Sequence, residues 1–324
     1  MYMIVLSGYL PEMAKAEAES MIKAMKGSVK KVDNNLMFFE VKNVSNLYRL
    51  GLAHSVHEVL LEANKKNFFD AVQKMKKIKG PIAVRVKFMG DKKPAEKKII
   101  DAVWRQSDRK VNLCKPKNVI NVFVVEKRVI VTRLVFEIDK SFIGSLKKMP
   151  FKKPITMDPR IARAMINLTG LTKGRILDPF CGTGALLKEA ATVGLRCYGS
   201  DISEDMVKGA QKNLAFFGLK AVLRKADATK LKSIWHKKFD AIVTDPPYGI
   251  STSLFNKNLK ELYTKSLRSM KSVLKPGGCV VIAVPKKLER SVIINARKLG
   301  FAVDTRIEQR VHKSLRRVFV RLYT

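Results

Sequence analysis

Residues 175–201 read RILDPFCGTGALLKEAATVGLRCYGSD, and this stretch decides the predicted fold. Arg175–Asp178 and Arg196–Asp201 are runs that are typical of strands in a buried sheet, and each ends in Asp. A predicted helix joins them from Thr183 to Val193. The same alternation of strand and helix continues to about residue 300, which predicts an α/β domain with a doubly wound parallel sheet, the Rossmann-like arrangement.

The whole chain is predicted to contain four parts. Residues 1–50 alternate strand-like and helical runs, which predicts a small α+β unit. Residues 51–140 repeat that pattern and end in a hairpin, so they predict a second α+β module. Residues 141–157 hold several Lys and two Pro with little periodicity, and we expect a linker there. Residues 158–324 form the doubly wound domain, which closes with a hairpin-like pair of strands.

The charge of the chain points to a polyanionic partner. With 64 Lys and Arg against 28 Asp and Glu, the 324 residues carry a formal charge of +36. Such a charge repels itself unless it meets a polyanion, and nucleic acid is the leading polyanion. A Lys-rich solvated surface and an anionic membrane surface are the alternatives. Thermophilic surfaces usually add Glu together with Lys, and the scarcity of acids here favours nucleic acid.

The composition disfavours several other classes of protein. No apolar run is long enough for a transmembrane helix, and the N-terminus does not resemble a secretory signal, so we expect no membrane partner. The four Cys, at positions 114, 181, 197 and 279, lack CxxC spacing, and the four His show no metal-ligand spacing. We therefore expect no metal site, no disulfide framework and a cytoplasmic protein.

Acidic residues recur at the ends of the predicted strands. Asp178, Asp201 and Asp245 each end a strand, and Asp227 follows another. In open α/β sheets, ligands bind beyond the carboxyl ends of the strands. Packing alone hardly explains four acids in register, because each places a charge at the same edge of the sheet. We therefore predict a ligand site at that edge.

The first acid opens a glycine-containing loop, DPFCGTG, at residues 178–184. Gly182 and Gly184 let the backbone pass close to a ligand, and the following helix offers free N–H groups at its N-terminus. A tight turn between strand and helix is the alternative. The G-x-G-x-x-G pattern of nicotinamide dinucleotide sites is not matched, because Leu187 stands at its last position.

Asp201 and Asp227 suit the two ends of a nucleoside. Asp201 follows Asp178 by 23 residues, and this spacing fits a carboxylate that binds ribose hydroxyls. Asp227 and Ala228 come after the next strand and would face an adenine edge. The alternative for Asp227 is a helix cap or a turn.

The sequence Asp245-Pro246-Pro247-Tyr248 ends the strand 241–244. Two prolines restrict the turn and fix the direction of its carbonyl groups. Asp245 and the Pro246 carbonyl can both accept hydrogen bonds from one exocyclic NH₂, which draws its lone pair toward the geometry of an attacking amine. Tyr248 can stack on the base that bears this amine.

These motifs together resemble motifs I to IV of the S-adenosylmethionine-dependent amino-methyltransferases of the D/N-P-P-Y type, over about residues 154–300. The resemblance implies S-adenosyl-L-methionine as the cofactor. The implied cofactor-binding residues are Asp178, Phe180, Cys181, Gly182, Thr183, Gly184, Asp201, Ile202, Asp227 and Ala228. The implied catalytic residues are Asp245, Pro246, Pro247 and Tyr248.

A wider resemblance covers nearly the whole chain. Residues 67–140 look like a THUMP RNA-binding domain that follows a small ferredoxin-like unit. With Met157–Met165 and the tail Arg310–Arg317, the sequence is similar to the tRNA (guanine-10) N2-methyltransferases, although Arg316 stands where a small hydroxyl residue is expected. This implies tRNA as the partner and the N2 amine of guanosine 10 as the target, with one or two methyl groups added. The need for a small activating subunit is left open.

Other functions remain alternatives at this point. Guanine presents N1–H and N2–H₂ side by side, two donors that one carboxylate accepts together, so Asp at 245 favours guanine over adenine. A THUMP methyltransferase for another guanosine, at tRNA position 6 or in ribosomal RNA, is the first alternative. A DNA adenine or protein glutamine N-methyltransferase is the second. A non-catalytic RNA-binding protein is the third.

Overall fold

The computed structural model describes residues 1–324 except 90–95, 109–115, 155, 249–254 and 313–314. The chain divides into two compact units. Unit 1 comprises Met1–Leu6, Gly27–Lys42 and Ala53–Ile138; unit 2 comprises Ser7–Lys26, Asn43–Leu52 and Asp139–Thr324. Both are mixed α/β, and each is described by itself below.

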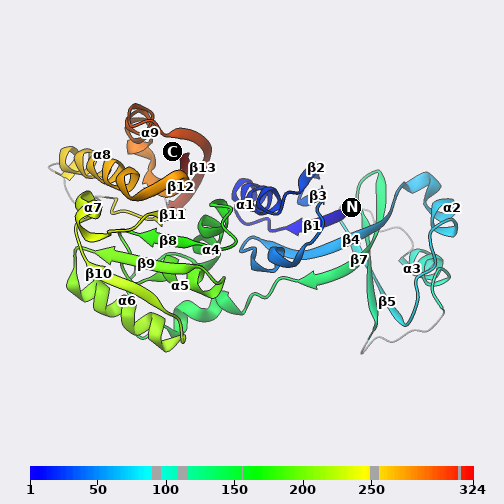
Figure 1. The fold of residues 1–324 in the computed structure, drawn as a ribbon. Helices are drawn as coiled ribbons and strands as arrows, with labels where there is room; N and C mark the ends of the chain where they lie inside the picture. The colour runs from blue at the N-terminus through cyan, green and yellow to red at the C-terminus, as the bar shows by residue number, and fades with distance from the viewer. Residues whose placement is uncertain (90–95, 109–115, 155, 249–254, 313–314) are drawn as a thin grey trace. The chain divides into compact units, whose positions relative to one another are not determined.

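Unit 1 is built on one seven-stranded sheet in the order β2-β3-β1-β4-β7-β6-β5 (Figure 1). Only the pair β5–β6 is parallel among its described strand pairs. The strands are β1 (Tyr2–Leu6), β2 (Ser28–Asp33), β3 (Leu36–Glu40), β4 (Ala53–Asn64), β5 (Ile82–Phe88), β6 (Asn118–Val124) and β7 (Arg128–Glu137). The hairpin predicted near the end of this module is the pair β6–β7 and is confirmed.

Two helices cover the part of this sheet that contains β5 and β6. In α2 (Phe68–Gln73) the side chains of Phe68 and Val72 are buried, and in α3 (Glu96–Trp104) those of Ile99 and Val103 are buried. All four pack in one apolar cluster with residues of β5 to β7. Within each helix the two residues are four apart, which is the spacing of a helix with one apolar face.

The sequence analysis did not identify β2 or β4 as strands. Ala53–Asn64 reads AHSVHEVLLEAN, which has no clean alternation of apolar and polar residues. It forms a strand because β1 and β7 pair with it on its two sides. Pairing of this kind is tertiary context that overrides local propensity.

Unit 2 contains the doubly wound domain, and the predicted fold class is confirmed. Its sheet has the order β10-β9-β8-β11-β12-β14-β13, with the first five strands parallel and the last two antiparallel. The strands are β8 (Arg175–Asp178), β9 (Arg196–Asp201), β10 (Ala221–Lys225), β11 (Phe239–Thr244), β12 (Leu274–Pro285), β13 (Ala302–His312) and β14 (Leu315–Tyr323).

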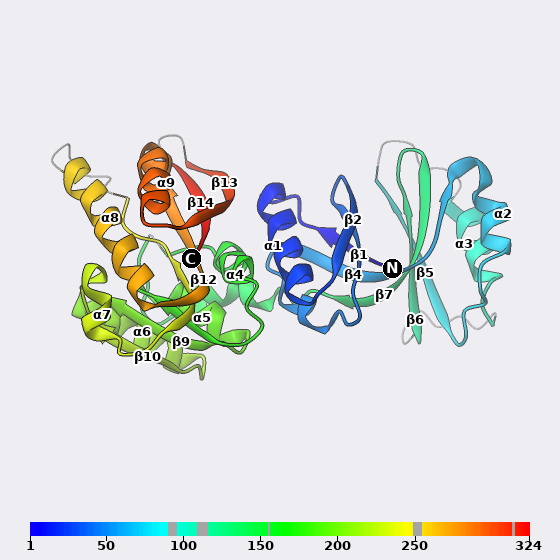
Figure 2. The ribbon, with the colours of Figure 1, turned by 45° about the horizontal axis from the view of Figure 1, so that its top comes forward.

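Helices cover both faces of this sheet (Figures 1 and 2). One face carries α4, α5 and α6, and the other carries α8 and α9. Their bounds, with those of α1 and the short α7, are α1 (Pro11–Ala24), α4 (Pro159–Leu168), α5 (Ala185–Thr192), α6 (Glu204–Phe216), α7 (Leu231–Ile234), α8 (Phe255–Val273) and α9 (Glu289–Lys298). Among described residues, no helix is long and apolar enough to cross a membrane.

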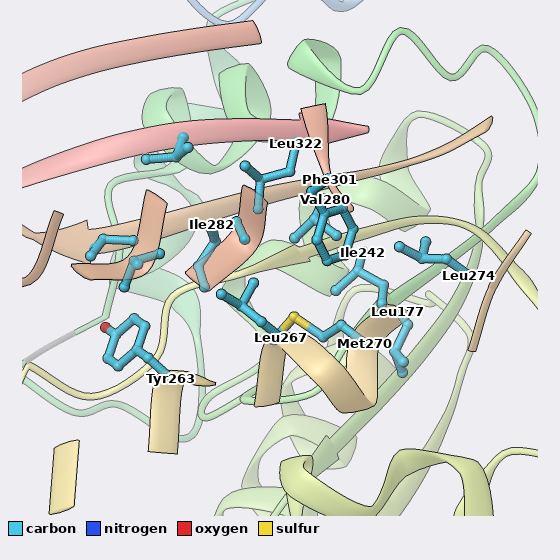
Figure 3. Packing of buried hydrophobic residues seen from close by; sticks show 14 of the residues in the cluster. Leu177, Ile242, Tyr263, Leu267, Met270, Leu274, Val280, Ile282, Phe301 and Leu322 are labelled. Carbon is cyan, nitrogen blue, oxygen red and sulfur yellow. The ribbon is translucent and has the colours of Figure 1, made fainter. Parts of the chain in front are cut away.

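The core beneath α8 and α9 is a single apolar cluster. Val280 and Ile282 of β12 and Ile242 of β11 lie against Leu267 and Met270 of α8 (Figure 3). These residues are fully or almost fully buried. Continuous apolar runs such as the one in β12 are expected where a parallel strand is covered on both faces.

An N-terminal segment is part of unit 2 rather than of a separate unit at residues 1–50. The Glu17 carboxylate of α1 accepts hydrogen bonds from the backbone N–H groups of Gly51, at 2.7 Å, and Leu52, at 2.9 Å. It also accepts one from Nδ2 of Asn167 in α4, at 2.7 Å. Asn167 in turn accepts a hydrogen bond from Nε of Arg49, at 2.7 Å. All three of these side chains are buried.

The segment predicted to be a linker, 141–157, also packs on unit 2. Phe142 and Met149 are buried, and Nζ of Lys188 donates to Oγ of Ser145 at 2.6 Å. Phe151 lies against Gly209, where a Cβ would approach its ring to 2.2 Å. The linker interpretation is therefore wrong for these residues. Exposed Lys side chains alternate with buried apolar side chains in this segment, and the composition indicated only the exposed Lys.

Replacing Glu17 with Ala should lower the free energy of unfolding of unit 2 by about 3 kcal/mol, because two backbone N–H groups and the Asn167 amide lose a buried partner. Urea unfolding followed by tryptophan fluorescence measures this. The background is Trp104→Phe, which leaves Trp235 of unit 2 as the reporter.

Glu19→Ala is the matched control. Glu19 lies on the same helix, but its side chain is 44% exposed and pairs with Lys15 at 3.9 Å, so we expect a change within about 0.5 kcal/mol. Equal effects of the two substitutions would contradict the buried role of Glu17.

Candidate functional site

The four predicted acids lie on neighbouring strands of unit 2. Asp178 and Asp201 end β8 and β9, Asp245 directly follows β11, and Asp227 follows β10. The order β10-β9-β8-β11 makes these strands adjacent and parallel. The structure therefore brings all four acids to the carboxyl edge of the sheet, where parallel strands place their ligand-binding residues.

The loop after β8 is folded around its glycines. Gly182 has a φ of 48° and Gly184 a φ of 81°, both in the left-handed region that glycine adopts without strain. A Cβ at Gly182 would meet nothing within 4 Å, whereas one at Gly184 would lie 3.1 Å from Cβ of Ala210. The backbone at Gly182 thus borders open space, and the helix α5 begins directly after Gly184.

Hydrogen bonds to residues outside the loop also hold the loop after β8 in place. The backbone N–H of Cys181 donates to the Ser200 carbonyl at 2.9 Å, and Nδ2 of Asn213 donates to the Thr183 carbonyl at 2.9 Å. Cys181 is buried, and burial raises the pKa of its thiol far above the ordinary value. A neutral, buried thiol lines this loop rather than acting as a nucleophile.

Asp178 is a buried carboxyl group that joins two strands. Its Oδ1 accepts hydrogen bonds from the Thr244 hydroxyl, at 2.7 Å, and from the Phe180 N–H, at 3.1 Å. Burial, together with the nearby carboxylates of Asp201 and Asp245, raises the pKa of Asp178 to about 7 against the opposing effect of these two hydrogen bonds. Asp178 therefore anchors the loop to β11.

Asp201 holds the turn between β9 and α6. Its Oδ2 accepts from the Gly182 N–H at 2.9 Å, and its Oδ1 accepts from the Ser203 N–H at 3.0 Å. A carboxylate has about four acceptor positions, so each oxygen can accept a further donor. Ile202 beside it is 72% exposed, an unusual position for a large apolar side chain at the mouth of a site.

Asp227 acts as the cap that the sequence analysis left as an alternative. Its Oδ1 accepts hydrogen bonds from the N–H and the hydroxyl of Thr229, both at 2.8 Å, at the start of a 3₁₀ turn (Ala228–Lys230). Ala228 is buried. These two hydrogen bonds to Oδ1 hold the Asp227 carboxylate at the edge of the sheet, next to β9.

Asp245 and Tyr248 form a charged cluster with an arginine. The Tyr248 hydroxyl donates to Oδ1 of Asp245. Nη1 of Arg317 lies 3.6 Å from Oδ2 of Asp245 and donates to the Tyr248 hydroxyl oxygen at 3.3 Å. Burial raises the pKa of Asp245, while Arg317 and the Tyr248 hydrogen bond act in the opposite direction. Burial also raises the pKa of Tyr248 well above its ordinary value.

The two prolines of this motif have different surroundings. Pro246 is buried and Pro247 is exposed. The Pro247 carbonyl accepts a hydrogen bond from the hydroxyl of Tyr263 in α8, at 3.4 Å. Gly249, and Lys313 and Ser314 of the basic tail, lie outside the described residues.

Arg317 is a site residue that the sequence analysis did not single out. It stands in a tail rich in Arg and Lys, where nothing in the sequence separates it from its neighbour Arg316. The structure separates them, because the Arg317 side chain is 9% exposed and the Arg316 side chain is 59% exposed.

The comparisons with known proteins agree with this architecture. A family model described as "RMKL-like, methyltransferase domain" matches residues 147–318. A second model, described as "DNA methylase", matches residues 3–212 and ends before Asp245. The solved structure of TrmN from Thermus thermophilus has a TM-score of 0.54 and 19% identity, and covers 100% of this chain and 99% of that one. The fold and the matched domain define a methyltransferase with a Rossmann-like catalytic domain.

Sequence relatives give the family. The tRNA (guanine(10)-N2)-dimethyltransferase of Pyrococcus abyssi is 41% identical over 98% of both chains. The protein of the same name from Methanothermobacter thermautotrophicus is 35% identical over 98% of this chain and 97% of the relative. This chain belongs to the tRNA (guanine(10)-N2)-dimethyltransferase family.

Asp178 should make unit 2 less stable as the pH rises. Its pKa is about 7 in the folded state against an ordinary value of 3.8. The folded state therefore binds more protons over this interval, and the free energy of unfolding falls from about pH 4 to pH 7. Asp178→Asn removes this loss, so the variant should gain stability relative to wild type between pH 5 and pH 8. Urea unfolding at both pH values, with Trp235 as the reporter, measures it.

Asp240→Asn is the control with the opposite sign. Asp240 accepts hydrogen bonds from the Arg175 N–H and from Nζ of Lys275, and these interactions lower its pKa. That variant should be destabilised at pH 5 and at pH 8 alike. A pH-independent difference between Asp178→Asn and wild type would refute the buried protonation of Asp178.

Proposed function

We propose that this protein methylates the exocyclic N2 amine of guanosine 10 in tRNA, with S-adenosyl-L-methionine as the methyl donor, and that it adds two methyl groups. The observation that carries the proposal is the agreement between the sequence relatives and the geometry of the site. Relatives of that name align over 98% of the chain, and Asp245 and Tyr248 stand together at the carboxyl edge of the parallel sheet.

The residues at this edge fit the proposed cofactor. The open space at Gly182 leaves room for the methionine end beside Phe180–Gly184 and Asp178. Free acceptor positions on Asp201 suit the ribose hydroxyls, and the exposed Ile202 suits one face of the adenine ring. Asp227 and Ala228 would face the adenine edge. When bound, the cofactor supplies an electrophilic methyl group.

Asp245 supplies the recognition and the proton acceptor for the reaction. As a carboxylate it accepts the N1–H and N2–H of guanine together, a donor pair that adenine does not offer. The Pro246 carbonyl accepts the second amine hydrogen, so the N2 lone pair is directed at the methyl group. N2 would form the new N–C bond as the methyl–sulfur bond of the bound cofactor breaks, and the proton that the amine loses would pass to Asp245 and then to solvent.

The remaining parts of the chain support binding of a polyanion. The charge of +36 suits an extended tRNA surface. We propose that unit 1, which contains most of the residues expected to form the THUMP domain, holds the tRNA, and that the protein acts in the cytoplasm. The target amine lies in a paired stem, so the nucleotide must be flipped out at a cost of a few kcal/mol.

The target is tested with a tRNA transcript and isotopically labelled S-adenosylmethionine. We expect label in N2-methylguanosine and then N2,N2-dimethylguanosine at position 10, and no label in a transcript with inosine at position 10, which lacks the amine. Asp245→Ala should lower the rate at least about 100-fold.

The alternatives predict other results. Label at position 6 or in ribosomal RNA would establish a different guanosine as the target. Transfer to duplex DNA or to a glutamine peptide, with none to tRNA, would establish the second alternative. Equal background rates for wild type and Asp245→Ala would establish a non-catalytic RNA-binding protein.

Asp201→Ala should weaken cofactor binding by about tenfold or more and leave tRNA affinity unchanged, because a hydrogen bond to a charged group contributes about 1.5–3 kcal/mol. Titration calorimetry with S-adenosylmethionine measures this. Asp205→Ala, which removes an exposed carboxylate from the first turn of α6, is the matched control. Unchanged cofactor affinity in Asp201→Ala would defeat the ribose assignment.

A further inference from the structure

The sheet topology delivers Arg317 to the edge that carries Asp245. Strand β14 runs antiparallel to β12, and Arg317 pairs with Pro285 at the end of that strand. Strand β12 runs parallel to β11, whose end is followed by Asp245. An antiparallel strand begins where its parallel neighbours end, so the first residues of β14 lie at the carboxyl edge of the sheet.

The guanidinium of Arg317 is held in one orientation. Its Nε donates to Oε1 of Gln309 at 2.8 Å, and Gln309 is the backbone partner of Arg317 across the β13–β14 pair. With Nε fixed, Nη1 reaches both Oδ2 of Asp245 and the hydroxyl of Tyr248. Gln309 and Arg317 are both buried. A planar guanidinium fixed at one nitrogen has few remaining ways to turn.

We propose that Arg317 is a positioning residue for methyl transfer, which holds Asp245 as an ionised acceptor in a fixed orientation toward the target guanine. This inference rests on the proposed function and deepens it.

The physical need for such a residue follows from the partial burial of Asp245, whose side chain is 22% exposed. A carboxylate removed from water loses much of its hydration, and without a nearby cation it is protonated more readily. A protonated Asp245 would present an O–H donor to the N1–H of guanine, which is itself a donor. It also could not accept the proton that N2 releases, because it already carries one. Arg317 opposes both effects through its charge.

Four other groups bear on the charge of Asp245. Tyr248 donates to it from the same loop, and Tyr263 approaches from α8 through the Pro247 carbonyl. Asp178, on the adjacent β8, is coupled to Asp245 by charge repulsion. Asp201 lies one strand further and is coupled to Asp178. In the part of the chain that the structure describes, the ion pair of Asp245 is the one with Arg317.

Arg317 also holds the Asp245 carboxylate and the Tyr248 hydroxyl close to each other. The Tyr248 hydroxyl occupies Oδ1 of Asp245 in this structure, and that oxygen is one of the two that guanine would need. Because Oδ1 keeps a second acceptor position, it can accept from the base while Tyr248 still donates to it. The bond from Arg317 to the Tyr248 hydroxyl then remains available to hold the ring near the base.

The test compares the maximal rate of tRNA methylation, at saturating tRNA and cofactor, from pH 5.5 to pH 9. In Arg317→Met the pKa of Asp245 should rise, because the charge of Arg317 no longer opposes the effect of burial. The ratio of the variant rate to the wild-type rate should therefore rise from the acid end to the alkaline end, by up to about tenfold. Groups that do not interact with Asp245 titrate alike in both proteins and cancel in this ratio. Cofactor affinity should change by less than about twofold.

Two variants serve as controls. Arg317→Lys keeps the positive charge but loses the bond to Gln309, so its rate should fall while its ratio to wild type varies much less with pH. Arg316→Met removes an exposed charge from the adjacent position, and its pH profile should match that of wild type. If Arg317→Met does not fold, as judged by circular dichroism, Gln309→Leu should give the same pH trend with a smaller amplitude.

A pH-independent ratio for Arg317→Met, or a wild-type rate, would overturn the positioning role. Failure of the proposed function looks different: wild type itself would then transfer no methyl group to guanosine 10, and the variants would not be needed to detect it.

Discussion

The site depends on the parallel pairing of β8, β9, β10 and β11. Parallel strands end at the same edge, so acids that are far apart in the sequence become neighbours there. Asp178, Asp201 and Asp245 reach that edge from β8, β9 and β11. The backbone N–H of Gly182 then joins two of these strands by donating to Asp201. The helices that cover both faces of the sheet keep these strands in place, and the positions of the strand ends in turn set the positions of the acids.

Bringing acids together is unfavourable, and the structure compensates for it with fixed donors. Asp178 receives the Thr244 hydroxyl and the Phe180 N–H, and Asp245 receives Tyr248 and Arg317. Away from the edge, Glu189 is paired with Arg163 and Lys188 in the interior of unit 2. Buried charges persist in proteins when they are paired in this way. At the edge, the same pairing leaves carboxylates that are oriented before any ligand arrives.

Much of the fold could be predicted because its signals are local. The strand and helix alternation of residues 175–201, the glycines of the loop and the hairpin at the C-terminus appear at their predicted places. The extent of each compact unit could not be predicted in this way. The helix α1 is early in the sequence but belongs to unit 2, because Glu17 meets Gly51, Leu52 and Asn167 only after folding. Likewise, β4 is a strand because it has a strand on each side.

By itself, the sequence determined which chemistry the chain carries: a glycine loop, a series of strand-ending acids and Asp245-Pro246-Pro247-Tyr248, each readable because residue type and spacing lie within one short segment. Tertiary structure alone decided that Arg317 faces Asp245 while Arg316 faces solvent. Adjacent residues of a strand point to opposite faces, and the antiparallel pairing of β14 with β12 sets which of the two reaches the site. That choice requires a register between distant strands, which no local pattern encodes.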